Sequence, residues 1–165
     1  MSSVQKVSYS ATWSTTRSVP VESLLVIGTG SIGFRHLINA TVLGVPELAV
    51  FSTGIGVGNG VVPDGVRVET DLEQALARGV RAVIIANPTS LHIESALPAA
   101  RTGCHLLIEK PLSHTLAGIE ELHRQIGTQQ VAMVGYQFRF HPSLQQIRSW
   151  LEERAIGEVV SARAV

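Results

Sequence analysis

From Ser23 onward, short apolar segments alternate with segments of helical periodicity, and this alternation limits the fold more than any other feature. A chain built in this way forms a parallel sheet whose right-handed crossover helices cover its faces. The prediction is a doubly wound α/β fold with strand order 3-2-1-4-5-6. The six expected strands are Leu24 to Ile27, Glu47 to Phe51, Val66 to Val68, Arg81 to Ala86, His105 to Ile108 and Val131 to Val134.

Local signals refine three of these elements. Thr70 and Glu73 have capping-box spacing, which predicts that a helix opens there. Pro98 lies inside the helix expected over His92 to Ala100 and should kink or shorten it, because proline removes a backbone hydrogen bond. The segment Arg81 to Ala86 contains an Ala-Val-Ile-Ile-Ala run, which is typical of a strand covered on both sides of the sheet.

The two ends of the chain lie outside this alternating part. Residues 1–22 are rich in Ser and Thr and are interpreted as a polar leader, although an edge strand around Val4 to Tyr9 is an alternative. Residues 23–141 are the expected main domain. Residues 142–165 contain a helix that begins at Pro142 and then a strand pattern after Gly157. That strand either pairs at the sheet edge or, as we prefer, opens a truncated second α/β domain.

Composition excludes several classes of protein. Of the 165 residues, 45% are hydrophobic, and the 13 basic residues balance the 13 acidic ones. Such a chain can bury a core, and it lacks the basic excess that nucleic-acid binding requires. It also lacks an apolar run long enough to cross a membrane, so we expect a cytoplasmic protein. The single cysteine, Cys104, excludes an internal disulfide, and no metal site is expected.

The first expected strand leads into a glycine motif, Gly28-Thr29-Gly30-Ser31-Ile32-Gly33, which fits G-x-G-x-x-G. Placed between a strand and a helix, this pattern predicts dinucleotide binding. Gly28 would allow the tight turn, Gly30 the approach of a diphosphate, and Gly33 close packing of helix on strand. A Rossmann domain is therefore expected. A second cluster, Gly54 to Gly60, lacks this spacing and is interpreted as a loop.

The end of the second strand bears on the choice of cofactor. An NAD site usually places a carboxylate there to hold the ribose 2′-hydroxyl, but this chain has Ser52 and Thr53. Small hydroxyl residues do not repel a 2′-phosphate, which favours NADP over NAD. The nearest downstream basic residue is Arg67, so a partner for that phosphate is not evident and both cofactors stay open.

The later strand ends carry a family resemblance. Asn87-Pro88-Thr89-Ser90-Leu91-His92 follows the fourth strand, Glu109-Lys110-Pro111 the fifth, and Gly135-Tyr136-Gln137-Phe138-Arg139-Phe140 the sixth. This order resembles the N-terminal domain of the glucose–fructose oxidoreductase/inositol dehydrogenase family (Gfo/Idh/MocA), and His36 matches a further family feature. The Glu-Lys-Pro element argues against other two-domain dehydrogenases that share the cofactor fold, such as those of the homoserine or dihydrodipicolinate type.

The resemblance implies roles for individual residues. Lys110 would lie by the nicotinamide and the substrate hydroxyl as the catalytic residue, and Glu109 would face the cofactor. Pro111 would follow a cis peptide bond. The remaining family positions would line the cofactor cleft: Asn87, Pro88, Thr89, His92 and Arg139. For Glu109, His92 and Arg139, a purely structural or surface role is the alternative.

The resemblance also implies a function. Family members are NAD- or NADP-dependent oxidoreductases that transfer hydride to or from a secondary alcohol of a sugar, cyclitol or sugar derivative, and they are often homo-oligomers. Their substrate pocket comes from a C-terminal domain, which this chain is expected to lack. The alternative is therefore a non-catalytic dinucleotide-binding module or an inactive fragment.

Overall fold

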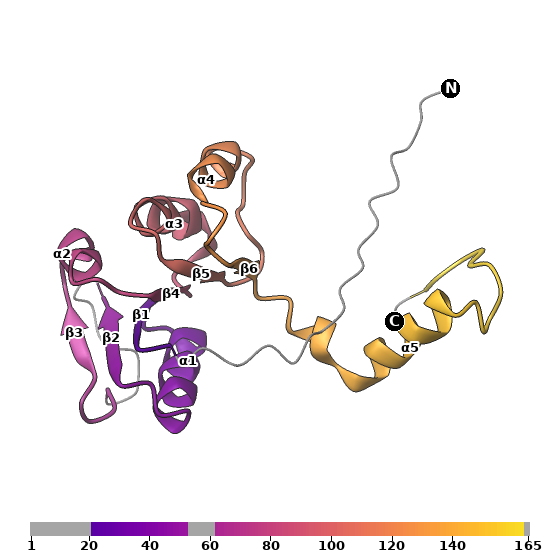
Figure 1. Ribbon diagram of the computed structural model, residues 1–165, viewed down its shortest axis with the longest axis horizontal. Helices are drawn as coiled ribbons and strands as arrows, with labels where there is room; N and C mark the ends of the chain where they lie inside the picture. The colour runs from indigo at the N-terminus through magenta and orange to yellow at the C-terminus, as the bar shows by residue number, and fades with distance from the viewer. Residues whose placement is uncertain (1–20, 53–61, 164–165) are drawn as a thin grey trace.

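The computed structural model describes residues 21–52 and 62–163. It contains a six-stranded parallel sheet in the order β3-β2-β1-β4-β5-β6, which confirms the predicted doubly wound fold (Figure 1). The strands are β1 (Ser23–Ile27), β2 (Glu47–Phe51), β3 (Arg67–Glu69), β4 (Ala82–Ile85), β5 (His105–Ile108) and β6 (Ala132–Val134). The helices are α1 (Ser31–Val42), α2 (Leu72–Ala77), α3 (His92–Arg101), α4 (Ile119–Gln125) and α5 (Pro142–Glu152), with 3-10 turns η1 (Thr89–Leu91) and η2 (Gln137–Phe140).

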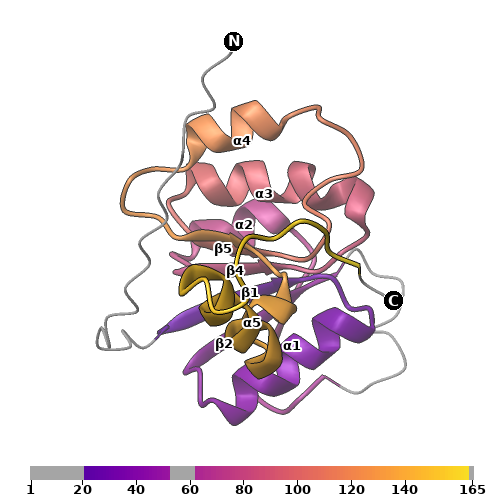
Figure 2. The ribbon, with the colours of Figure 1, turned by 90° about the vertical axis from the view of Figure 1, so that its right-hand side faces the viewer.

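Helices lie on both faces of the sheet, with α1 on one face and α2, α3 and α4 on the other (Figure 2). Because successive strand residues point to opposite faces, the strands divide the core into two clusters. Alternate residues such as Leu25, Ile27 and Val83 pack beneath α2 and α3. Leu24, Val26 and Val50 pack with Leu37 and Ala40 of α1.

The two sides of β4 and β5 are buried to different extents. In β4 and β5 the residues that face α3 are buried, whereas their neighbours on the α1 side, including Ala82, Ile84 and Leu107, are half-buried. Ala82 and Ile84 pack against the core cluster beneath α1. The prediction of a strand covered on both sides is therefore confirmed only in part for β4, because its α1 side stays partly exposed.

Two local expectations are wrong. Asp71, not Thr70, caps α2, because the Asp71 side chain accepts a hydrogen bond from the Gln74 amide. Helix α3 is not shortened at Pro98 but continues to Arg101, where the burial of Ala96, Ala99 and Ala100 against the sheet outweighs one lost backbone bond.

The strand pattern after Gly157 does not pair at the edge of the sheet, because residues 158–163 lie in no ladder. Val159 and Val160 there are 58% and 99% exposed, so the strand pattern lacks the cover that would stabilise it. Its preferred interpretation, the first strand of a second domain, stays a prediction.

In the part of the chain that the structure describes, none of the helices combines the length and the apolar character needed to cross a bilayer. The last helix, α5, lies outside the sheet domain, joined to β6 by a connector over residues 135–141 (Figure 1).

Candidate functional site

The carboxyl ends of the central strands lie side by side and continue the sheet ladder into the loops. The Gly28 amide donates to Phe51 O, Ala86 N to Ile27 O, and Glu109 N to Ile85 O. After β1 the chain turns to α1 on one face, whereas after β4 it turns to α3 on the other. A crevice between neighbouring strands that diverge in this way is where open α/β sheets bind their ligands.

Two glycines of the motif are required by the fold. Gly28 has φ of +108°, and a Cβ there would lie 2.6 Å from Asn87 N. A Cβ on Gly33 would overlap Gly28 O. The turn can therefore close against the β4 loop, and α1 against the turn, only without side chains at these two positions.

Gly30 differs from both, because a Cβ on it would meet nothing within 4 Å. Gly30 is the N-cap of α1, and Phe34 N is the donor to its carbonyl, so the amides of the first turn have no acceptor within the helix. No acidic side chain lies in that first turn. An uncrowded, positively polarised helix start fits an anionic diphosphate.

A cavity of about 440 Å³ lies over this turn. It is lined by part of the glycine motif, Gly28 to Ile32, together with Phe51 and Ser52 from β2 and Ala86, Asn87, Pro88 and Leu91 after β4. Thr53, the other expected residue of the ribose end, lies outside the described residues.

A second cavity of about 520 Å³ shares Ile32, Ala86 and Asn87 with the first, so the two adjoin. Its lining includes the expected residues Thr89, His92, Glu109 and Lys110. Lys110 is exposed at the end of β5, and its peptide bond to Pro111 is cis, as the resemblance implied. The structure thus brings most of the expected residues to one continuous cleft.

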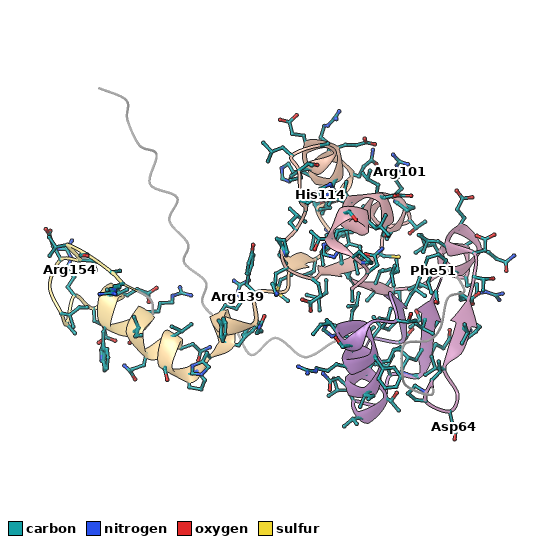
Figure 3. The ribbon with its side chains drawn as sticks, turned by 180° about the vertical axis from the view of Figure 1, so that it is seen from behind. Phe51, Asp64, Arg101, His114, Arg139 and Arg154 are labelled. Atoms are coloured by element: carbon teal, nitrogen blue, oxygen red, sulfur yellow. The ribbon has the colours of Figure 1, made fainter. Side chains whose placement is uncertain are left out.

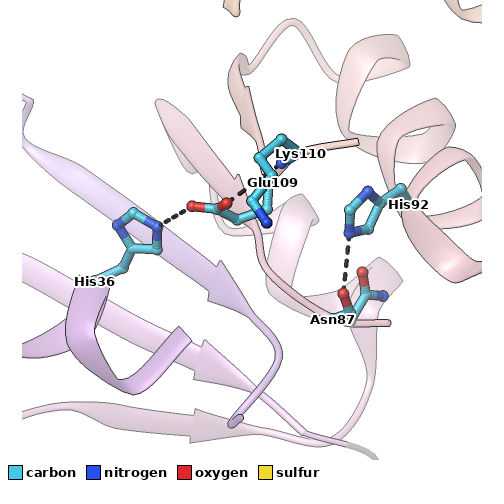
Figure 4. A network of polar contacts seen from close by, with 5 residues as sticks. All are labelled: His36, Asn87, His92, Glu109 and Lys110. Carbon is cyan, nitrogen blue, oxygen red and sulfur yellow. Dashed lines mark hydrogen bonds and ion pairs between the residues drawn. The ribbon is translucent and has the colours of Figure 1, made fainter. Parts of the chain in front are cut away.

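Glu109 connects two sides of this cleft (Figure 4). One carboxylate oxygen lies 2.8 Å from His36 Nε2 on α1, and the other accepts from the Lys110 amide at 3.3 Å. The carboxylate therefore fixes the end of β5 against the helix that carries the glycine motif. The sequence marked His36 only as a family match, and nothing in its spacing, 73 residues from Glu109, indicated this contact.

His92 lies between the loop after β4 and the loop after β5. Its side chain is 1% exposed, with Nδ1 3.0 Å from Pro111 O and Nε2 3.0 Å from Asn87 O. The imidazole thus bridges the loop after β4 and the loop after β5. Asn87 donates from Nδ2 to Ser95 Oγ at 2.8 Å, while its buried Oδ1 has no partner among the described residues.

Arg139 is the expected residue that lies elsewhere. It lies in η2 with its guanidinium 5.7 Å from the centre of the Phe140 ring, and it lines neither cavity of the cleft (Figure 3). The same connector supplies residues that sequence reasoning did not assign to the site, Tyr136, Gln137 and Phe140. The sequence could have indicated these three residues, because they follow the carboxyl end of the sixth expected strand, and parallel sheets bind ligands at those ends.

A family model described as an oxidoreductase family with an NAD-binding Rossmann fold matches residues 23–138. The chain belongs to the Gfo/Idh/MocA family. Inositol 2-dehydrogenase from Streptomyces avermitilis is 33% identical over 140 residues, which cover 80% of this chain and 40% of that protein. The 4-carboxy-2-hydroxymuconate-6-semialdehyde dehydrogenase of Sphingobium is 42% identical over 82 residues, 48% of this chain and 26% of that protein.

Solved members of the Gfo/Idh/MocA family have the same fold. The myo-inositol dehydrogenase of Lactobacillus casei, crystallised with NAD(H) and myo-inositol, superposes with a TM-score of 0.75 at 26% identity. The match covers 83% of this chain and 43% of that one. This chain spans 40–44% of the length of the inositol dehydrogenases it matches in Streptomyces and Corynebacterium. It is therefore an NAD-binding domain of this oxidoreductase family.

Proposed function

We propose that this cleft holds NAD or NADP with its diphosphate over the glycine turn and its nicotinamide beside Lys110. The domain would serve an oxidoreductase that moves hydride between the nicotinamide and a secondary alcohol of a sugar, cyclitol or sugar derivative. One observation carries the proposal: the cavity over Gly30 adjoins the cavity that Lys110 lines. Together they would give an extended dinucleotide an anion site for its central diphosphate and a cation beside its nicotinamide end.

Different residues of the cleft would have different roles in binding and in catalysis. The first amides of α1 would bind the diphosphate, which the open space at Gly30 admits. The nicotinamide supplies the hydride acceptor or donor when it is bound. The Lys110 ammonium would donate a hydrogen bond to the substrate oxygen and stabilise its alkoxide character as hydride leaves. The unpaired Asn87 Oδ1 would accept a hydrogen bond from the cofactor, since a buried acceptor without a partner is costly.

The preference for NADP over NAD stays a prediction. The sequence over residues 51–61 has no carboxylate. The nearest buried one, Glu69 beside the end of β2, is paired with Arg67 and Arg78 and lines neither cavity of the cleft. Glu69 is therefore not placed to hold the ribose 2′-hydroxyl in the way that a carboxylate usually does in an NAD site. Both arginines in turn are engaged by Glu69, so neither is a ready partner for a 2′-phosphate.

Fluorescence titration of the full chain with NADH and NADPH, followed by turnover assays on myo-inositol and a panel of sugars, tests the proposal. We expect saturable binding of at least one coenzyme, with NADPH the tighter ligand. Absence of binding by both coenzymes would refute the cofactor site. Binding without turnover on any polyol would favour the alternative, a non-catalytic dinucleotide-binding module.

A further inference from the structure

Lys110 and the residue before it, Glu109, carry opposite charges but do not pair. Lys110 forms no ion pair with any residue in the described part of the chain. Of the residues that the structure describes, Glu109 is the one acid lining the cavity that Lys110 lines. An ammonium on a flexible four-carbon stem and a carboxylate on the next residue attract each other. Something else in the structure must therefore hold the Glu109 carboxylate.

Both oxygens of the Glu109 carboxylate are engaged by other groups (Figure 4). Oε1 lies 2.8 Å from His36 Nε2, and Oε2 accepts from the Lys110 backbone amide at 3.3 Å. The carboxylate also lies beside Gly135, where a Cβ would come within 3.4 Å of Oε1 and 3.5 Å of Oε2. These contacts hold the carboxylate toward α1, the helix that carries His36.

Burial favours the contact with His36 over an ion pair with Lys110. The side chains of His36 and Glu109 are 21% and 18% exposed, whereas Lys110 is exposed. A partly buried contact is screened less by water and salt than one made at an exposed position. Exposed ion pairs also contribute little, because two long side chains must be ordered to form them. The Glu109 carboxylate is therefore more stable toward α1 than toward Lys110.

The position of His36 on α1 fits a polar role better than a packing role. His36 lines the cleft cavity and belongs to neither of the two core clusters. The next residue, Leu37, takes the core position and is 0% exposed. The hydrogen bond of the His36 ring instead reaches the end of β5, 73 residues along the chain.

We propose that His36 is a positioning residue that holds the Glu109 carboxylate toward α1 and so leaves the Lys110 ammonium unpaired for the substrate oxygen. This role rests on the proposed function, in which Lys110 donates to that oxygen. A carboxylate paired with Lys110 would compete for the donors of the ammonium, and its negative charge would oppose alkoxide character nearby. His36 would thus act through Glu109 and Lys110 without touching the reacting atoms.

Acetylation of Lys110 in the full chain, without coenzyme, tests whether its ammonium is paired. An adjacent carboxylate favours the protonated amine and so slows its reaction with an acetylating reagent. Lys6, the other lysine of the chain, is the reference in mass spectrometry. His36→Leu releases the carboxylate, whereas His36→Gln keeps an N–H donor for it. Asn39→Leu, at an exposed position further along α1, is the matched control.

We expect His36→Leu to slow acetylation of Lys110 by about threefold relative to Lys6, which is the size of an exposed ion pair. His36→Gln and Asn39→Leu should leave the rate within about 1.5-fold of that in the parent chain. Adding Glu109→Gln to His36→Leu should restore the rate, because the released side chain then carries no charge. An unchanged rate in His36→Leu, or a slow rate that Glu109→Gln does not restore, would overturn the proposal.

The single variant Glu109→Gln keeps the proposal testable if His36→Leu loses its circular dichroism spectrum. We expect it to leave acetylation of Lys110 within about 1.5-fold of the parent rate, because the native carboxylate does not pair with the ammonium. A rise of about threefold would show that the two pair in the parent chain and would overturn the proposal. These rates are measured without coenzyme, so a failure to bind NADH would refute the proposed function and leave this result unchanged.

Discussion

His36 Nε2 and Glu109 Oε1 lie 2.8 Å apart and join the helix behind the glycine turn to the strand that ends at Lys110 (Figure 4). The two side chains are only 21% and 18% exposed. Both side chains line the cavity that Lys110 also lines. The contact therefore joins two walls of that cavity, one from α1 and one from the end of β5.

A double-mutant cycle with His36→Ala and Glu109→Gln should give a coupling energy of about 1 kcal/mol in the free energy of unfolding, because a partly buried polar contact is lost. Urea denaturation of the four proteins measures it. The matched control is Arg101–Glu121, a pair with 54% and 41% exposed side chains, for which we expect less than about 0.5 kcal/mol. Equal coupling in both cycles would contradict a special role for the cleft pair.

Substitutions of the three motif glycines should have two distinct effects, one on the stability of the fold and the other on NADH affinity. Gly28→Ala and Gly33→Ala should each destabilise the fold by about 2 kcal/mol or more, because the new methyl groups meet backbone atoms. Gly30→Glu should leave the melting temperature nearly unchanged and weaken NADH binding by at least about tenfold, or about 1.4 kcal/mol. Gln129→Glu, which adds the same charge at an exposed turn, is the control. Unchanged NADH affinity in Gly30→Glu would place the diphosphate elsewhere.

Lys110 should be shielded by bound coenzyme. The chain has two lysines, Lys6 and Lys110, so acetylation can be followed at each by mass spectrometry. Saturating NADH should slow acetylation of Lys110 by about tenfold, because the nicotinamide would cover the ammonium group in the cavity. Lys6 serves as the internal reference. The same rate at Lys110 with and without NADH, under conditions where binding is measured, would remove Lys110 from the nicotinamide site.

His92→Leu should destabilise the domain by about 2 kcal/mol, because the imidazole N–H that can donate to one of the two adjacent loop carbonyls is lost from a buried position. It should also weaken NADH binding, since the loops after β4 and β5 would no longer be held together. Thermal melting and NADH titration measure the two effects. The exposed His123 offers the control His123→Leu, with an expected change within about 0.5 kcal/mol. A stability loss with unchanged affinity would restrict His92 to a packing role.

Much of the fold followed from local patterns. Apolar runs and their spacing located all six strands, and the glycines located the turn after β1, because these signals arise from neighbours in the chain. Where a pattern depended on distant partners, prediction was weaker. The run over Arg81 to Ala86 is apolar on both sides, but the packing of α1 decides that one side of β4 is only half-buried. The strand pattern after Gly157 likewise depends on a neighbouring strand, which residues 158–163 do not have in this structure, so it stays a prediction.

The sequence by itself determined the order of strands and helices, the family, and which strand ends carry polar residues. The tertiary structure decided which of those residues meet. It placed His36 against Glu109 and His92 between two loop carbonyls, and it left Arg139 outside the cleft. The physical reason is that a pattern along the chain records local conformational preference, whereas a hydrogen bond across 73 residues exists only after packing has fixed both ends.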